Sequence, residues 1–331
     1  MKTGYKFFGL ALLLVTIAFA DIRWGSVAMN SNTFWQSLLH PHAENIYTSI
    51  LYDYRLPKMF TAFLAGSGLA LAGLLLQTLF RNPIVGPYVL GISSGAGLAV
   101  ALLLGLGAMA AWISGNVYAV SIAAITGSWI VLLINILLFK KLRRPEVLLV
   151  AGLMVGAFSG AVLGILAVRM PAAQLQKYFF WTTGNLGNVR PVELYIMAGG
   201  VVLAYALSLR QIKYLNLMLL GDAYLQAAGY PPRRLHLFII SIAGFITGII
   251  TAVTGPLAFT GLIVPHIGRL YFKSYSHQYL LPAVFLIGGA FMIGVDWISQ
   301  LPGQNGILPV NSITALIGAP LVIHLLIKNA R

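Results

Sequence analysis

The residues of this chain that could do chemistry are few, and the most suggestive string is GISSG at 91–95. It matches G-x-S-x-G, in which a hydrolase places a nucleophilic serine on a strand-to-helix turn beside His and Asp partners. Here the string opens an apolar helical stretch, where small residues allow close packing. We therefore prefer packing to catalysis; an activity lost on Ser93→Ala would favour an intramembrane hydrolase instead.

Ion coupling, phosphate binding and metal binding are also poorly supported. Asp296 is the acidic residue that we consider as an intramembrane acid, near the end of an apolar stretch. Transporters driven by H⁺ or Na⁺ usually carry more such acids, so we expect the energy source outside this chain. The sequence has no G-x-x-x-x-G-K-[ST] phosphate loop. His40 and His42 flank a proline without acidic neighbours, and we assign them no metal.

Glycines at regular spacing form the more informative pattern. In EVLLVAGLMVGAFSGAVLG, residues 146–164, they recur at Gly152, Gly156, Gly160 and Gly164. Residues i and i+4 share one face of a helix, so these glycines form a shallow groove that lets another backbone approach closely. Two interpretations stay open. The helix packs within one bundle, or it lines a path or a subunit seam.

The elements that must position these residues are membrane helices. The chain has 331 residues, of which 59% are hydrophobic and 8% charged, whereas ordinary soluble domains carry about 25% charged residues. Its 21 Lys and Arg outnumber 7 Asp and Glu, which fits basic cytoplasmic loops. The absence of cysteine excludes disulfides and thiolate metal sites. We predict an all-α polytopic membrane protein with one transmembrane domain, residues 1–331.

About ten helices of about 20 residues fit this length. We place them at 6–22, 57–79, 88–108, 116–139, 146–168, 191–209, 235–253, 261–272, 280–298 and 310–327. Segment 261–272 is too short to cross alone unless the preceding GPLAFT adds to it. The first twenty residues imitate a signal peptide, but we expect an uncleaved first helix.

Basic residues orient these helices. With the N-terminus inside, most Lys and Arg fall in the inner loops, as the positive-inside rule requires. The outer segments hold Arg23, Arg55, Lys58, Arg169, Lys177 and Arg190. We therefore expect both termini in the cytoplasm.

Three of the segments outside the expected helices are informative. Residues 23–56 form an outer loop, and residues 169–190 form a second outer segment whose aromatic residues suit the membrane interface. Residues 210–234 form the longest inner loop. We predict one or two short helices there, broken at Gly221 and closed by Gly229 and Pro231-Pro232.

A faint internal repeat is present. GPYVLG at 86–91 precedes the third expected helix, and GPLAFTG at 255–261 precedes the eighth. Five helices in each half would leave the halves inverted in the membrane. Gly-Pro at these places predicts irregular backbone, which a bilayer tolerates only where protein or a water-filled cavity covers it.

These features together resemble one known family. The stretch RLPKMFTAFLAGSGLALAGLLLQTLFRNPIVGPYVLGISSGAG (55–97) is similar to the signature of the FecCD permease family. GPLAFTGLIVPHIGRL (255–270) and LPVNSITALIGAP (308–320) are similar to its two C-terminal motifs. The resemblance implies the ten-helix fold of type II ABC importer permeases, and it spans nearly the whole chain.

The resemblance implies roles for basic residues and for the inner loop. Arg55 and Lys58 fall where the family receives acidic groups of its binding protein, while Gln300 stands where some relatives carry a third basic residue. The loop 210–234 resembles the family's coupling helices, which fit a groove of the ATPase. The residues that keep this pattern are Gly221, Ala227, Ala228, Gly229, Arg233 and Arg234. Interfacial anchoring and a solvated basic loop are the alternatives.

The resemblance also implies a translocation path. The glycine-rich helix 146–168 aligns with the family's fifth helix, and 310–327 with its tenth. The expected lining residues are Met154, Val155, Ser159, Thr314 and Leu316. Arg169, just beyond the glycines, is expected either to attract an anionic ligand or to anchor the helix at the interface.

The expected function is therefore a permease subunit rather than an enzyme. The resemblance implies import of an iron chelate, a siderophore or haem, across the bacterial inner membrane, with vitamin B12 as the alternative and an ion-coupled secondary transporter as a more distant one. It implies as partners a second copy of the chain, two ATP-binding cassette subunits that hold ATP-Mg, a periplasmic or lipid-anchored binding protein and membrane lipid. We expect no cofactor on this chain and no nucleic acid.

Overall fold

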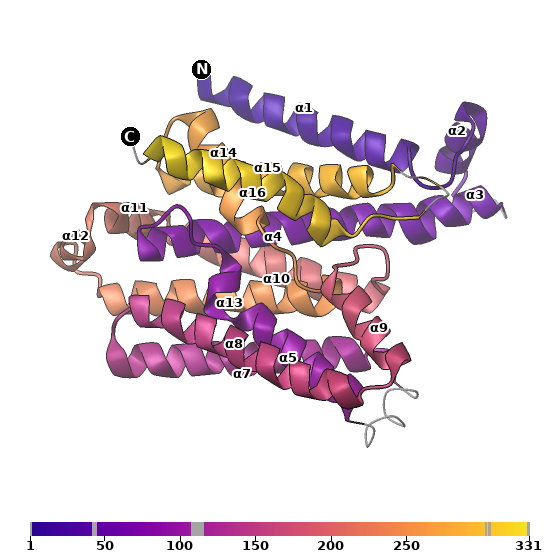
Figure 1. Ribbon diagram of the computed structural model, residues 1–331. Helices are drawn as coiled ribbons and strands as arrows, with labels where there is room; N and C mark the ends of the chain where they lie inside the picture. Colours follow the sequence, from indigo (N-terminus) through magenta and orange to yellow (C-terminus); the bar gives the residue numbers. More distant parts are fainter. Residues whose placement is uncertain (1, 42–44, 107–115, 302, 304–305, 330–331) are drawn as a thin grey trace.

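A computed structural model of the protein describes residues 2–41, 45–106, 116–301, 303 and 306–329 (Figure 1). Helices form this part of the chain, and no strand occurs in it. The membrane helices are α1 (Lys2–Arg23), α4 (Leu56–Phe80), α5 (Ile92–Gly105), α7 (Ala119–Leu142), α8 (Glu146–Arg169), α10 (Pro191–Arg210), α13 (Pro232–Thr254), α14 (Thr260–Phe272), α15 (His277–Ser299) and α16 (Val310–Asn329). Each expected span therefore overlaps one of these helices, and residues 107–108 of the third expected span lie outside the described residues.

Length separates these helices into two groups. Helices α1, α4, α7, α8, α10, α13 and α15 are long and apolar enough to cross a membrane. Helix α5 has 14 residues and α14 has 13, and the described apolar stretch of α16 is also short. The short segment expected at 261–272 is thus a short helix, and residues 255–259 before it are non-helical.

Shorter helices cap the two ends of the bundle. Both chain termini lie at one end, together with α11 (Ile212–Leu220) and α12 (Asp222–Ala227) (Figure 1). We call this the terminal end. The opposite, distal end carries α2 (Ser31–Leu39), α3 (Ile46–Ser49) and α9 (Ala172–Thr182). Termini at the same end are what an even number of crossings requires.

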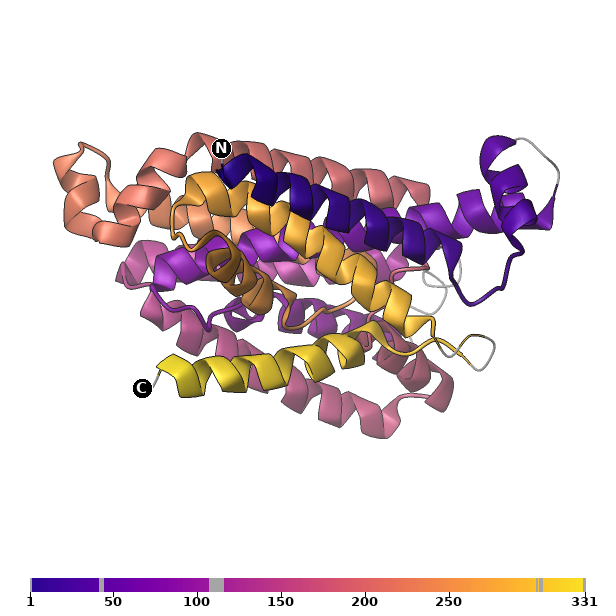
Figure 2. The ribbon, with the colours of Figure 1, turned by 90° about the horizontal axis from the view of Figure 1, so that it is seen from above.

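Helix α4 is the centre of the core. It packs on α15, α13, α14 and α10, and nearly all of its residues from Ala65 to Leu79 are buried. Glycines make these contacts close: a Cβ on Gly66 would lie 2.0 Å from the Gly288 carbonyl oxygen, and one on Gly73 would lie 1.7 Å from that of Gly261. In contrast, α8 is mostly exposed, and α16 runs along one side of the bundle (Figure 2).

The second membrane helix begins earlier than predicted. We expected an outer loop over residues 23–56 and a membrane helix from residue 57. The helix instead runs on from α3 through a π-helical turn, η1 (Ile50–Arg55), into α4. Pro57 has no N–H to donate, and its ring would crowd the carbonyl of a regular preceding turn. A wider turn at this point lets the helix continue through the proline.

The two Gly-Pro segments meet in the middle of the molecule. The first forms a 3₁₀ turn, η2 (Pro87–Leu90), which ends at Gly91 with φ 71°. The second is non-helical and contains Gly255 at φ 75°. They are in contact, because a Cβ on Gly261 would lie 2.5 Å from Cδ of Pro87. The predicted irregular backbone is confirmed, and neighbouring helices cover it, as a membrane interior requires.

Candidate functional site

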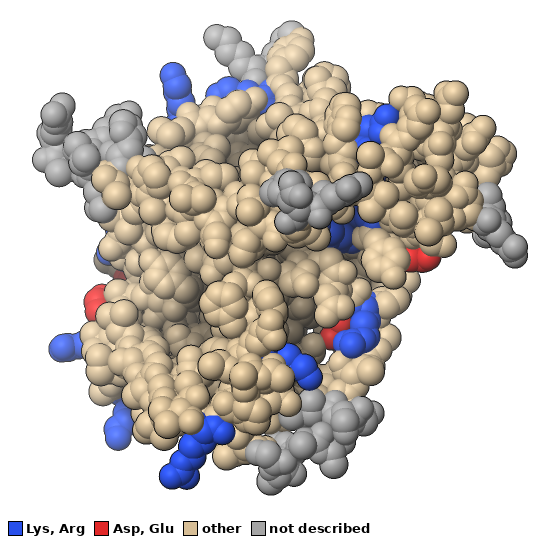
Figure 3. Space-filling view, turned by 45° about the vertical axis from the view of Figure 1, so that its right-hand side comes forward, with Lys and Arg blue, Asp and Glu red and all other residues tan. Residues whose placement is uncertain are grey.

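A cavity of about 570 Å³ opens at the distal end, where several elements converge. Its lining comes from η1 and the start of α4, from the segment after α9, from the end of α15 and from residues 307–310. Charged side chains are few and scattered on the side of the molecule that Figure 3 brings forward. The charged residues in the cavity lining are Arg55, Lys58 and Asp296, and its other lining residues are uncharged.

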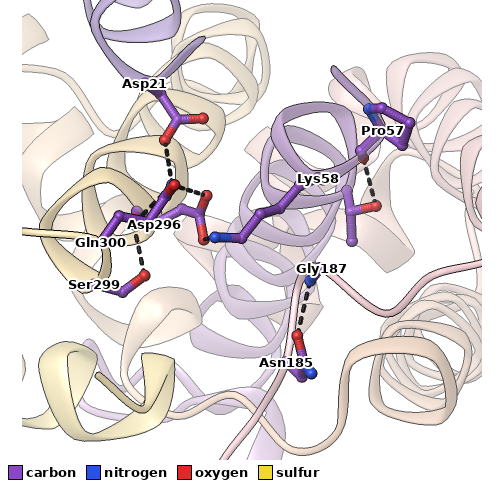
Figure 4. A network of polar contacts seen from close by, with 9 residues as sticks. Asp21, Pro57, Lys58, Asn185, Gly187, Asp296, Ser299 and Gln300 are labelled. Carbon is purple, nitrogen blue, oxygen red and sulfur yellow. Dashed lines mark hydrogen bonds and ion pairs between the residues drawn. The ribbon is translucent and has the colours of Figure 1, made fainter. Parts of the chain in front are cut away.

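A buried polar network forms one wall of this cavity (Figure 4). The Lys58 ammonium lies 2.9 Å from Oδ1 of Asp296, whose side chain is 0% exposed, while that of Lys58 is 14% exposed. The Gln300 amide donates to Oδ2 of Asp296 and to Oδ1 of Asp21, both at 3.0 Å. The network therefore joins α1, α4 and α15, and each of its charges has an opposite charge or an amide donor beside it.

Arg55 lies on the other side of this network and is also buried. Its guanidinium donates to the carbonyl oxygens of Ile22 at 2.6 Å and Arg23 at 3.3 Å, and to that of Val27. Carbonyls at the end of α1 have no partner within the helix, so a guanidinium is a suitable cap for them. Arg55 thus fixes the end of α1 on the start of α4.

These contacts bear on the two residues expected to receive a binding protein. Both Arg55 and Lys58 line the cavity, so they share one place at the distal end. Both already have partners within the chain, which the sequence did not reveal. Gln300 donates to two carboxylates. The docking role stays a prediction. It requires the Lys58 ammonium to leave its ion pair with Asp296 and to pair with an acidic group of the binding protein.

Asp21 is the member of this network that sequence reasoning missed. It falls within the first expected helix, 6–22, and the structure leaves it only 3% exposed. A signal was available, because an acid at the end of an apolar run needs a partner in a membrane. Its partner, Gln300, lies 279 positions away in the sequence. Only the folded chain brings the two together.

The glycine-rich face of α8 divides into two parts. A Cβ on Gly152 would lie 1.8 Å from the Val89 carbonyl oxygen, so this glycine permits close packing on η2. A Cβ on Gly156 would only touch Ser94, at 3.5 Å, and one on Gly160 or Gly164 would meet nothing within 4 Å. The packing interpretation therefore holds at Gly152. At the other three positions the face is left open within this chain.

The expected lining residues also differ in their surroundings. Met154 and Leu316 are 60% and 76% exposed, so they lie on open faces of α8 and α16. Val155 is partly buried, whereas Ser159 and Thr314 are buried. Helix α8 packs on α5, α7 and η2, while α16 packs on α14 and α15. Arg169 is exposed at the distal end of α8.

The predicted inner loop folds as two short helices, α11 and α12, separated at Gly221 with φ 122°. Gly229, at φ 74°, ends the second helix turn before Pro231-Pro232, as predicted. The small residues Ala227, Ala228 and Gly229 are all exposed. They form a small-residue surface at the terminal end that another protein can approach closely. Arg233, beside it, donates to the Lys140 carbonyl oxygen at 3.2 Å, and Arg234 is exposed.

Asp222 ties this surface to the membrane helices. It opens α12, and its Oδ1 lies 2.8 Å from Nη2 of Arg81, the residue that ends α4. Its Oδ2 lies 3.5 Å from Nε2 of His236 in α13. One carboxylate therefore connects α12 with both α4 and α13, a contact that sequence reasoning did not find.

The G-x-S-x-G string has no hydrolase geometry. The Ser93 hydroxyl lies 3.1 Å from that of Thr251, and no His or Asp contact to it is among the hydrogen bonds of the described residues. Gly95 packs directly on α7, since a Cβ there would lie 2.3 Å from Cγ2 of Val131. The small residues serve close helix packing, as expected.

Comparisons with known proteins agree with this architecture. The chain is 30% identical to the hemin transport system permease protein HmuU of Yersinia pestis, over 97% of this chain and 94% of that protein. It is 31% identical to the Fe(3+)-citrate import system permease protein YfmE of Bacillus subtilis, over 97% and 94%. It is 33% identical to the vitamin B12 import system permease protein BtuC of Klebsiella pneumoniae, over 84% and 82%.

A solved structure shares the fold. It is an inward-facing metal-chelate type ABC transporter, with a TM-score of 0.82, 27% sequence identity, and coverage of 98% of this chain and 99% of that one. The model of the FecCD transport family matches residues 12–328. The protein is therefore a multi-pass membrane protein and belongs to the FecCD transport family.

Proposed function

We propose that this chain is the membrane-spanning permease subunit of a binding-protein-dependent ABC importer. The observation that carries the proposal is the exposed small-residue surface of α12 at the terminal end, on a bundle that belongs to a transport family. Because the sequence has no phosphate loop, ATP-Mg is held by two partner ATPases that dock on this surface. The terminal end, with both termini, then faces the cytoplasm of the bacterial inner membrane.

The proposed cargo is an iron chelate, either a siderophore or haem. The named cargoes of HmuU and YfmE support this choice, and the named cargo of BtuC supports vitamin B12 as the alternative. The cargo enters from a binding protein at the distal cavity. It then passes between two copies of the chain, along the open faces of α8 and α16. No cofactor is required on this chain.

Coupling follows from the contacts at the terminal end. ATP binding draws the ATPases together and moves α12. The Asp222 carboxylate transmits this movement to α4 and α13, because it contacts a residue of each. Helices α8 and α16 then expose the path alternately to the two sides of the membrane.

The test is ATP-driven uptake in proteoliposomes that contain the chain, its candidate ATPase and its binding protein. Labelled haem, a ferric siderophore and cobalamin are compared. Uptake of one of them that disappears without ATP supports the proposal and identifies the cargo. Failure of any ATPase to co-purify, with transport that follows an ion gradient and is lost in Asp296→Asn, would favour a secondary transporter.

A further inference from the structure

A second cavity, of about 600 Å³, lies at the terminal end and plays no part in the proposed path. It lies between the end of α4, the last turns of α14 with the residues that follow, and the end of α11. Three of its lining residues are cations: Arg81, Arg269 and Lys273. None of its lining residues is acidic.

The positive charge of this cavity is only partly compensated. Arg81 forms an ion pair with Asp222, at 2.8 Å. Among the ion pairs of the described residues, none involves Arg269 or Lys273. Nη1 of Arg269 is buried and has no hydrogen-bond partner, while the guanidinium lies 5.8 Å from the Tyr275 ring. A buried guanidinium nitrogen without an acceptor is costly. An oxyanion in the cavity would give this nitrogen an acceptor that the described residues do not supply.

The ends of α4 and α14 explain why some of these cations are present, but they do not explain the Arg269 nitrogen that has no acceptor. Arg81 and Lys273 stand at the C-terminal ends of α4 and α14, where cations are favoured by the helix dipole. That effect supplies no acceptor for Arg269. The rest of the lining includes Gln77, Thr78, Asn82 and Ser274, polar groups that can hydrogen-bond an oxyanion.

The position of the cavity selects the kind of anion. Leu270 and Tyr275 line it and are exposed, and Tyr271 beside them is exposed as well. Exposed tyrosines and leucines next to basic residues are typical of the membrane interface. Guanidinium groups match phosphate oxygens in geometry, and basic pockets between membrane helices on the cytoplasmic side hold anionic lipid headgroups.

We propose that the cavity formed by α4, α11 and α14 binds a phosphate group through Arg269 and Lys273, supplied by an anionic phospholipid of the adjacent leaflet. Free phosphate has the same chemistry and is distinguished in the test. The inference rests on the proposed function only for placing this end in the cytoplasm. Because the cavity contacts Leu219 of α11, an occupied cavity would also steady the coupling segment.

The test measures lipid retention by the purified full-length chain, without ATP, cargo or partners. Nanodiscs of phosphatidylcholine with and without phosphatidylglycerol are used, and the lipid that stays bound is measured by native mass spectrometry. Lys273→Gln and Arg269→Gln should each lower phosphatidylglycerol retention about fivefold. Lys141→Gln, which removes an exposed cation at the same end outside the cavity, should leave retention unchanged.

The outcomes distinguish the lipid site, a free-phosphate site and the proposed function. Equal retention in Lys273→Gln and Lys141→Gln would overturn the proposal. Stabilisation of the wild type by inorganic phosphate in pure phosphatidylcholine, lost in Lys273→Gln and without any preference for phosphatidylglycerol, would support the phosphate site and overturn the lipid as its source. If Arg269→Gln fails to fold, lipid retention by Lys273→Gln still decides the question, because Lys273 is exposed. Failed uptake together with normal lipid retention would refute the proposed function and leave the lipid-site proposal intact.

Discussion

Lys58 and Asp296 show at the residue scale how this bundle accommodates charge. A buried ammonium and a buried carboxylate each lose hydration, and their contact at 2.9 Å offsets that loss only while both are present. Gln300 adds an amide donor and extends the network to Asp21. The same wall of the distal cavity therefore contributes to stability and presents the residues expected at the docking site.

We predict that Lys58→Met lowers the free energy of unfolding by about 3–5 kcal/mol, because Asp296 is left as an uncompensated buried charge. The measurement is denaturant unfolding in detergent. The double variant Lys58→Met with Asp296→Leu should recover most of that loss. Lys177→Met, which removes an exposed cation at the same end, serves as the control and should have little effect. A Lys58→Met protein as stable as the wild type would refute the buried pair.

At the scale of elements, α8 offers a comparison within one helix. Gly152 packs on η2 with no room for a Cβ, whereas Gly160 faces open space. Gly152→Ala should lower stability by about 1–3 kcal/mol, because the backbones must separate. Gly160→Ala should be neutral, since nothing lies within reach of the added methyl group. Thermal unfolding of the two variants side by side measures the difference.

The open part of α8 should matter for transport instead. Leucine in place of Gly156 or Gly160 should abolish ATP-driven uptake, because the bulk fills a face that the path or a second copy uses. Gly160→Leu should still fold, because nothing lies within 4 Å of a Cβ at that position, whereas a Cβ on Gly156 already lies 3.5 Å from the Ser94 hydroxyl. Normal uptake in these variants would remove the glycine-rich face from the mechanism.

The contact of α12 with the bundle gives another prediction at this scale. Asp222 and Arg81 are both substantially exposed, so Asp222→Asn should cost at most about 1 kcal/mol of stability. Uptake should nevertheless fall about tenfold, if a coupling contact of about 1.4 kcal/mol is lost. Glu146→Gln, an exposed acid at the same end, is the matched control. Equal uptake in the two variants would exclude Asp222 from coupling.

At the scale of the whole molecule, the absence of cysteine makes topology directly measurable. Ala228→Cys lies at the terminal end and Lys177→Cys at the distal end, and both positions are exposed. In intact spheroplasts, a membrane-impermeant maleimide should label Lys177→Cys and leave Ala228→Cys unlabelled until the membrane is opened. The reverse labelling pattern would show that the protein has the opposite orientation to the one that its basic residues predict.

The sequence alone determined the class of this protein and much of its course through the membrane. Apolar runs of membrane length, Gly-Pro breaks and basic loops are local features, and a bilayer obliges the backbone to satisfy its own hydrogen bonds in helices. For this reason the helices at all ten expected positions, the irregular segments at 86–91 and 255–259 and the break at Gly221 could be predicted from residue types and spacing.

Tertiary structure decided which residues serve which purpose. Lys58 meets Asp296, and Asp21 meets Gln300, across most of the length of the chain. Gly152 and Gly160 look alike in the sequence, yet one packs on η2 and the other faces open space. Such distinctions depend on which distant segment lies opposite a side chain. Spacing along one helix gives the face on which a residue lies, but only packing of the whole bundle gives that face a neighbour.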